Sequence, residues 1–600
     1  MFLATTALDQ FWDKSKKILF LGPWCLLYQK RSEWSNLDFQ VMESPWTDRE
    51  QFYKAAGYTD AIYEQSLRVL TDYLNAIHKT KYSERYWRIL IGPWLIRYIH
   101  SLYDRYCHIH SAFQNHDPLE TWCLSSECFI TPQNISHFID LYVDDFYNLQ
   151  LYSQITGFMG YNFLTIQFHH QMSSGKNDIK NRKVISKIEE TVKCQTKRFC
   201  ATINDLIARR KKILLCGLYI PRSVVWKIVY ASQFQAWPFE KQWDRYWPNL
   251  EYLDYKAREG LGDLPASDNF SKLLVQTLPI NFPILYLEGY QKSREQVLQE
   301  WKKFPKVLMS SVSWYFNEYF KLLAAEACER GTLLLACQHG GGYGSGKIPV
   351  ETHEIKVSDM FYSWGWRSNE YSNKVKPLPT PRLSGSLLRS LSSNRLARET
   401  ILFVTTNHPR YLYYFYSCPV GLQFEDYCEM RKDFIHSLSP EYRNMLLFRL
   451  YPTDYGRFQK DRLREEFPYL RFDNHRLSLA KQLLKVRIVV IDHPMTSFLE
   501  TLSYNFPCIL FWNPNYWEMR NEAVRFFEGL RQAGILFDSA ESAAVKLMEV
   551  YDDPLRWWSS AEVQSARKTF ITRFALGSNE WLKAWINELR VASNKKCAIS

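Results

Sequence analysis

Three stretches of the sequence place polar side chains directly after short apolar runs. The first is the glycine-rich stretch from Gln338 to Lys347, which has five glycines between Gly340 and Gly346. The second contains Arg449, and the third runs from Asp492 to Glu500. In α/β proteins ligands bind beyond the carboxyl ends of parallel strands. The three stretches are therefore candidates for contacts with a substrate.

The glycine-rich stretch suits an anionic ligand. Backbone N–H groups at Gly340 and Gly341 can approach a phosphate or an oxyanion closely, because glycine leaves them uncovered. Residues 341–347 also fit the first seven positions of a P-loop. However, Ile348 stands where that loop needs a Ser or Thr for Mg²⁺, and Pro349 gives a poor helix start. The pattern therefore argues against ATP hydrolysis.

His339 and two carboxylates that follow it are the candidate catalytic residues. His339 comes after an apolar run at a predicted strand end, where acid/base work or a phosphate contact suits it better than packing. Glu354 and Asp359 follow closely and could share its cleft. Either His339 or Glu354 could deprotonate an acceptor hydroxyl, as group transfer to an alcohol requires. A structural histidine and a solvated Glu354 are the alternatives.

Arg449 lies at the carboxyl end of another predicted strand. Its guanidinium could clamp a monophosphate or diphosphate with two hydrogen bonds. An ion pair at the surface is the alternative.

The third stretch lies within a predicted strand, helix and strand, about the size of one right-handed parallel crossover. Asp492 ends the first strand, and a helix begins near Thr496 and Ser497. A helix N-terminus offers N–H groups and a partial positive charge to an anion. One interpretation is that Thr496 and Ser497 hold a donor phosphate and that Glu500 accepts from ribose hydroxyls. Alternatively, Ser497 and Glu500 form a capping box that only starts the helix.

The rest of the chain predicts two series of buried strands separated by helices. The strands are expected at 213–220, 282–287, 307–312 and 332–337, and then at 401–406, 445–451, 486–491 and 508–512. Helices are expected at 477–484, 498–504, 523–533 and 543–551. This alternation is typical of α/β layers. Residues 16–22 and 86–94 are two more predicted strands, each leading into Gly-Pro-Trp, and could line one edge of the same sheet.

Composition sets the predicted domain boundaries. A Pro- and Ser-rich linker at 377–394 separates an N-terminal domain, 1–385, from a C-terminal domain, 386–560. The N-terminal domain is expected to contain a helical insertion at about 115–211, including a Lys-rich solvated patch at 173–190. Residues 561–600 are expected to form a helical segment that packs back.

Charge and cysteine usage restrict the partners. The 75 Lys and Arg against 63 Asp and Glu give a net charge of +12, but no long basic run appears, so nucleic acid is not an expected partner. The 13 cysteines contain no C-x-x-C pair, which indicates reduced thiols in the cytoplasm. No apolar stretch reaches the roughly 18 residues that span a bilayer, and peripheral contact with the inner membrane face stays open.

In their order, these motifs resemble those of the GT-B transferases of bacterial surface polysaccharides. The motifs are QHGG at 338–341, Asp359 with Trp364-Gly365, Pro381-Arg382, Arg449 in Arg-Leu-Tyr-Pro, and DHPMTSFLE at 492–500. The chain is similar to the capsule Kdo-type transferases and the teichoic-acid glycerophosphotransferases. Over nearly its whole length it also resembles a family of transferases found with O-antigen genes.

The resemblance implies an α/β fold of the GT-B type, with two Rossmann-like parallel-sheet domains facing a cleft. It implies a nucleotide-activated sugar donor held by the C-terminal domain, a glycan or lipid-linked glycan acceptor held by the N-terminal domain, and no obligatory metal or other cofactor. Donor contacts would come from seven residues: Gly340, Gly341, Arg449, Asp492, Thr496, Ser497 and Glu500. His339 would lead catalysis, with Glu354 and Asp359.

We therefore expect a glycosyltransferase that moves a sugar or sugar-acid onto a surface polysaccharide of the O-antigen or capsule type. The nearest look-alikes use cytidine donors, but Tyr451-Pro452 replaces their usual H-P and residues 492–497 replace D-Y-S-S. The nucleotide therefore stays open. The alternatives are a CDP-polyol phosphotransferase of the teichoic-acid type and a non-catalytic glycan- or nucleotide-binding protein with the same fold.

Overall fold

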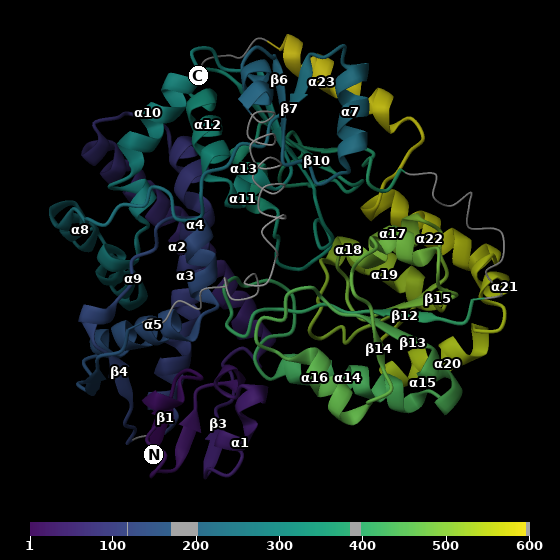
Figure 1. Cartoon of the computed structure of the whole chain (residues 1–600), viewed down its shortest axis with the longest axis horizontal. Coiled ribbons are helices and arrows are strands. Elements are labelled where there is room, and N and C mark those ends of the chain that lie inside the picture. The colour runs from purple at the N-terminus through teal and green to yellow at the C-terminus, as the bar shows by residue number, and fades with distance from the viewer. Residues whose placement is uncertain (117, 170–201, 385–397, 596–600) are drawn as a thin grey trace, which may run out of the picture.

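The computed structural model describes residues 1–116, 118–169, 202–384 and 398–595. It contains two six-stranded parallel sheets, one at the top and one at the right of Figure 1. The first has the order β11-β10-β9-β8-β6-β7 and the second the order β14-β13-β12-β15-β16-β17. In each sheet the strand order reverses once, between β6 and β8 and between β12 and β15, as in Rossmann-like sheets.

Seven of the eight strands predicted in the two series are present, and β7, β10, β11, β14 and β17 are strands that were not predicted. The first sheet consists of β6 (Ile213–Cys216), β7 (Ala236–Pro238), β8 (Val307–Ser310), β9 (Leu333–Cys337), β10 (Met360–Ser363) and β11 (Val375–Pro377). The second consists of β12 (Ile401–Val404), β13 (Leu446–Arg449), β14 (Arg471–Phe472), β15 (Ile488–Ile491), β16 (Cys508–Phe511) and β17 (Leu536–Phe537). Strands β6, β8, β12, β15 and β16 are buried along their whole length, as expected for parallel sheets covered on both faces.

The N-terminal region adds a separate body of helices beside the first sheet. Its main members are α2 (Arg49–His78) and α3 (Glu84–Asn115), which pack along each other. Asp48 caps the start of α2 and Ser83 the start of α3, each accepting hydrogen bonds from backbone N–H groups of the first turn. A small parallel sheet of β1 (Phe2–Ala4), β2 (Ile18–Phe20) and β3 (Phe39–Val41) lies near the N-terminus (Figure 1).

Two sequence predictions are wrong here. Residues 86–94 belong to helix α3, so they do not join the strand at 16–22 in one sheet. The apolar run misled because this part of α3 is buried on every side, and a short buried helix segment cannot be told from a buried strand by periodicity. Pro93 lies inside the helix although it cannot donate to the carbonyl of Ile89. Close by, Lys321 Nζ donates to the carbonyl of Leu90 at 3.0 Å. Residues 282–287 form only a 3₁₀ turn at Ile284–Tyr286.

The predicted helices of the second half are present as α17 (Leu479–Leu483), α18 (Thr496–Ser503), α19 (Asn521–Gln532) and α20 (Ala540–Val550), followed by α22 (Ala561–Phe574) and α23 (Trp581–Asn594). Helices α14 (Gln423–Ser437), α15 (Pro440–Met445), α16 (Gln459–Glu466) and α21 (Pro554–Trp558) were not predicted. Helix α23 returns to the first sheet and packs through Trp585 and Leu589 beside α7 (Arg222–Ala231), as the yellow helix in Figure 1 shows. The last helices thus tie the two sheets together.

Residues 115–211 contain, in their described part, β4 (Trp122–Leu124), α4 (Ile135–Tyr142), α5 (Asp145–Phe158) and β5 (Leu164–Ile166). The predicted Lys-rich patch at 173–190 and most of the predicted linker lie outside the described residues. Among the helices that the structure describes, none is both long and apolar enough to cross a membrane.

Candidate functional site

A cavity of about 850 Å³ opens at the carboxyl ends of the second sheet. Thr405 and Thr406, which follow β12, and His493, which follows β15, line it at the point where the strand order reverses. Tyr219, after β6, and Arg382, after β11, close it from the first half of the molecule. The cavity therefore lies between the two halves, at the switch point where open α/β sheets bind ligands.

Four of the predicted donor residues line this cavity: Arg449, Thr496, Ser497 and Glu500. Helix α18 begins at Thr496, and its N-cap residue Met495 makes no side-chain cap. The capping-box alternative is thus wrong, because Ser497 lies within the first turn of the helix. The backbone N–H groups of that turn are left to a ligand or to water.

Glu500 is paired across the cavity wall with Arg382. Arg382 Nε donates to Glu500 Oε1 at 2.6 Å, and its guanidinium also lies 4.4 Å from the ring of Tyr219. In the sequence, Arg382 stands out only as part of the Pro381-Arg382 motif. It joins the two halves at the cavity, a role that spacing along the chain cannot reveal.

Arg449 lines the cavity and is also part of an ion pair. Its Nη1 contacts Asp473, and its Nη2 donates to the carbonyl of Leu477 at 3.0 Å. The two sequence interpretations of Arg449 are therefore not exclusive. The ion pair holds the segment that presents His475 and Ser478 to the cavity.

Asp492 is buried rather than open to a donor, and it orients the neighbouring histidine. Its carboxylate accepts hydrogen bonds from Arg431 Nε at 2.6 Å and from the hydroxyl of Tyr427 at 2.8 Å, and lies 2.9 Å from His493 Nδ1. Burial would raise the pKa of Asp492, but the charge of Arg431 and the hydrogen bond with His493 hold it below its ordinary value.

His493 is the functional candidate that the sequence reasoning missed. A buried carboxylate fixes one ring nitrogen, while the residue itself lines the cavity. In such a pair the carboxylate sets the orientation of the ring. The signal was present in the sequence, because His493 stands between Asp492 and a proline directly after a buried strand.

The cavity lining is predominantly positive. Arg382, Arg449 and Lys481 contribute cationic side chains, and Glu500 is the one carboxylate among the described lining residues. The N-terminus of α18 adds a partial positive charge at the same place. This combination suits a phosphate-bearing ligand.

His339 and Glu354 form a second cluster at the edge of the first sheet. His339 Nδ1 lies 3.3 Å from Glu354 Oε1, and the hydroxyls of Tyr315 and Tyr343 donate to the same carboxylate at 2.8 and 3.0 Å. Glu354 is fully buried, whereas 26% of the His339 side chain is exposed. Burial raises the pKa of Glu354, and the hydrogen bond with His339 opposes that rise. A solvated Glu354 is thus ruled out.

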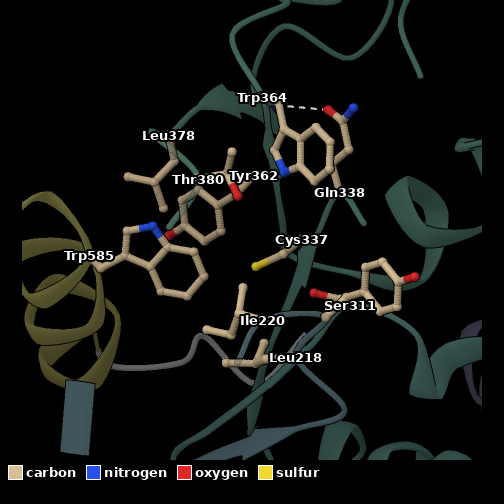
Figure 2. Close-up of a pocket in the computed structure, with 11 residues that line it drawn as sticks. Leu218, Ile220, Ser311, Cys337, Gln338, Tyr362, Trp364, Leu378, Thr380 and Trp585 are labelled. Carbon is tan, nitrogen blue, oxygen red and sulfur yellow. Dashed lines mark hydrogen bonds between the residues drawn. The ribbon is translucent and has the colours of Figure 1, made fainter. Parts of the chain in front are cut away.

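Gln338, the residue before His339, is held by hydrogen bonds. Gln338 accepts a hydrogen bond from the backbone N–H of Trp364 at 2.8 Å and another from Trp366 Nε1 at 2.9 Å. Figure 2 shows Gln338 turned toward Trp364 above a small apolar pocket whose wall includes Cys337 and Trp585. With a volume of about 10 Å³, this pocket is too small for a substrate. The two hydrogen bonds to Gln338 fix the start of the loop that carries His339.

Gly340 and Gly341 connect the two clusters. Gly341 N–H donates to Thr496 Oγ1 at 3.0 Å, and a Cβ on Gly340 would lie 3.2 Å from the same oxygen. These glycines therefore allow the first half to approach the start of α18. The predicted contact of Gly341 N–H with phosphate is replaced here by a contact with Thr496.

The structure does not bring Asp359 to His339. Asp359 precedes β10, accepts a hydrogen bond from Leu334 N–H at the start of β9 and pairs with Arg85 at 2.9 Å. His339 follows the other end of β9, about 16 Å away at 3.3 Å per residue. The predicted catalytic role of Asp359 is therefore wrong. The two residues are close in the sequence, but they lie at opposite ends of the parallel strands.

Among the described residues, no three His, Cys, Asp or Glu side chains lie close enough to hold a metal ion.

Two Rossmann-like parallel sheets facing one cavity define a GT-B type of α/β protein, as the resemblance implied. The sequence profile of the LIC12162 family transferases matches residues 1–589, and the chain belongs to this family. No curated protein matches.

The solved structures similar to this chain have low identities and low TM-scores. The wall teichoic acid polymerase TagF is 11% identical, with a TM-score of 0.31, over 69% of this chain and 98% of that chain. UDP-GlcNAc 2-epimerase from Neisseria meningitidis is 10% identical, with a TM-score of 0.35, over 63% and 99%. WaaG, a glycosyltransferase involved in lipopolysaccharide biosynthesis, is 10% identical, with a TM-score of 0.29, over 63% and 99%. At such scores nothing about activity follows from them.

Proposed function

We propose that this transferase moves a sugar or sugar-acid from a nucleotide-activated donor to a hydroxyl of a surface polysaccharide acceptor. The observation that carries this proposal is the positively lined cavity at the start of α18, with His339 and Glu354 close by. The cavity volume of about 850 Å³ is within the range of small-molecule sites.

The donor phosphate would bind at the N-terminus of α18, next to Thr496 and Ser497. Arg449 and Lys481 would add positive charge, and Glu500, held by Arg382, would accept from ribose hydroxyls. These groups would stabilise the negative charge that develops on the phosphate as the bond between it and the sugar breaks. We propose that no obligatory metal takes part.

The acceptor would be activated by His339. As the acceptor oxygen forms its bond to the sugar, His339 would take the hydroxyl proton, and the electron pair of the broken bond would leave with the nucleotide phosphate. Glu354 would stabilise the imidazolium that results. His493 would act on the other side, as a hydrogen-bond partner of the leaving phosphate oriented by Asp492.

The first experiment is calorimetric binding of CMP, CDP, UDP, GDP and ATP to the full chain, without and with Mg²⁺. Binding of a pyrimidine or guanine nucleotide without metal, lost in Glu500→Ala, would support the donor site. Binding of ATP alone, dependent on Mg²⁺ and on Lys347, would overturn the proposal.

A second measurement separates an enzyme from a binding protein. His339→Ala should keep nucleotide binding and lose transfer to the acceptor. Absence of donor turnover in the unmodified protein, despite tight binding, would favour a non-catalytic role. Phosphate in the product would indicate polyol-phosphate transfer instead of glycosyl transfer.

A further inference from the structure

Arg97, in the middle of helix α3, is a half-buried cation whose charge has no acidic partner among the described residues. Among the described residues, its side-chain hydrogen bond runs from Nη1 to the carbonyl of Pro93, within the same helix, at 2.7 Å. Other arginines of the chain are paired with carboxylates: Arg88 with Glu64, Arg49 with Glu518 and Arg410 with Asp145, each at 2.6 Å. The Arg97 guanidinium is therefore available to an anion that approaches from solvent.

The position of Arg97 connects it to the catalytic cluster. Its Cζ lies 5.1 Å from the centre of the Tyr315 ring. The hydroxyl of Tyr315 donates to Glu354 at 2.8 Å, and the Tyr315 ring lies 6.4 Å from that of His339. One aromatic ring therefore separates Arg97 from the candidate base and its carboxylate.

Two aromatic rings, Tyr315 and Phe316, lie against the guanidinium. Phe316, whose side chain is 43% exposed, has its ring 5.4 Å from Arg97 Cζ, so this side faces solvent. Tyr413 and Tyr414, from the segment after β12, lie within electrostatic range: burial raises the pKa of both phenols, and the charge of Arg97 opposes that rise. Aromatic faces and phenol hydroxyls suit the apolar faces and hydroxyls of a sugar ring.

We propose that Arg97 binds the anionic group of the acceptor, a carboxylate or a phosphate, and so makes the protein selective for acidic acceptors. The guanidinium fork matches both anions in a bidentate geometry. An acceptor anchored there would place a neighbouring hydroxyl toward His339. This inference rests on the proposed function, because it uses His339 as the base for the acceptor.

The test is saturation-transfer NMR on the full chain with three small probes: glucuronate, glucose 6-phosphate and uncharged glucose. We expect at least one anionic probe to bind about tenfold more tightly than glucose. Arg97→Gln should abolish that preference, and Arg97→Lys should keep part of it, because a lysine retains the charge and loses the fork. Arg590→Gln, which removes one charge from the exposed side of α23, is the matched control and should leave the preference intact.

The outcomes are distinct. Preference for glucuronate alone identifies an acidic sugar as the source of the anion, and preference for glucose 6-phosphate alone identifies a phosphorylated acceptor. Equal binding of all three probes to the unmodified protein, or a preference that survives in Arg97→Gln, overturns the proposal. Folding of the variants is checked by thermal unfolding.

Nucleotide binding, measured in parallel, separates the two levels of inference. Arg97→Gln should bind the donor nucleotide as the unmodified protein does, because Arg97 does not line the 850 Å³ cavity. If the unmodified protein binds no nucleotide, the proposed function itself is contradicted.

Discussion

Gly341 lies directly against the backbone of Met495. A Cβ on Gly341 would lie 2.5 Å from the carbonyl carbon of Met495 and 2.7 Å from the nitrogen of Thr496. This contact joins the loop that carries His339, in the first half, to the start of α18, in the second. The geometry between base and donor site therefore depends on a glycine at position 341.

Gly341→Ala should lower the free energy of unfolding by about 1–3 kcal/mol, as overpacking of a tight contact does. The added methyl group meets backbone atoms, which cannot rotate away. Gly529→Ala, in α19, is the control, since a Cβ there meets nothing within 4 Å and an alanine should be neutral or stabilising by up to about 1 kcal/mol. Urea denaturation measures both, and equal stability of the two variants would show that the halves do not meet as described.

Glu354→Gln should reduce acceptor-dependent turnover by about 10²- to 10⁴-fold, the usual contribution of general acid–base catalysis, because His339 loses the carboxylate that supports it as the base. The amide keeps the shape of the side chain but cannot balance the charge of a protonated His339, 3.3 Å away. Nucleotide affinity should stay unchanged, because Glu354 does not line the donor cavity. Steady-state kinetics measures the turnover, and calorimetry measures the nucleotide affinity. Full turnover in the variant would show that Glu354 has no role in the mechanism.

Asp492→Asn should destabilise the second half by about 3–5 kcal/mol, because it leaves the buried charge of Arg431 without its counter-ion. Glu466→Gln is the contrast: its ion pairs with Lys432 and His436 are exposed, so the cost should be below about 1 kcal/mol. Denaturation curves of the two variants compare them. Similar small losses in both would mean that Asp492 is not buried with Arg431.

Sequence patterns predicted the sheets well and the site only in part. Strands such as β15 and β16 are apolar throughout and flanked by breaking residues, so their position follows from composition alone. The 86–94 stretch failed because burial on all sides hides the helical period. The prediction for Asp359 was wrong for a different reason. Strands β9 and β10 are parallel, so the chain returns between them to the end of the sheet where β9 begins, and Asp359 lies there. Distance along the chain does not show this return.

Contacts between the halves were beyond the sequence. Arg382 and Glu500 form an ion pair although they are 118 residues apart in the sequence. Neither motif predicts a contact with the other. Likewise His493 and Arg449 looked like separate strand-end residues, although one cavity collects both. Local patterns give the candidates, and only the packing of two sheets selects among them.

Arg449→Ala should weaken nucleotide binding by about tenfold or more and cost some stability as well. The variant removes a cation from the cavity and also leaves Asp473, only slightly exposed, without its partner. Asp473→Asn separates the two effects, because it frees the guanidinium from its ion pair while keeping the cation. If binding is unchanged in Arg449→Ala, the arginine is a structural ion-pair partner and not a donor contact.

The stability of the helical N-terminal region should depend on pH through His78. Burial lowers the pKa of this histidine at the end of α2 to about 4, from 6.5 in an unfolded chain, while a ring nitrogen lies 3.0 Å from the carbonyl of Tyr286. As pH falls, the unfolded chain takes up the proton first, so stability is complete above pH 6.5 and declines toward pH 4. The full loss is about 3 kcal/mol for a shift of this size. The measurement is the free energy of unfolding in urea from pH 7 to pH 4. It should change less with pH in His78→Gln, whose amide can still donate to Tyr286. His110→Gln, on the less buried face of α3, is the control and should keep the pH dependence of the unmodified protein. An unchanged slope in His78→Gln would place the pH dependence in another group.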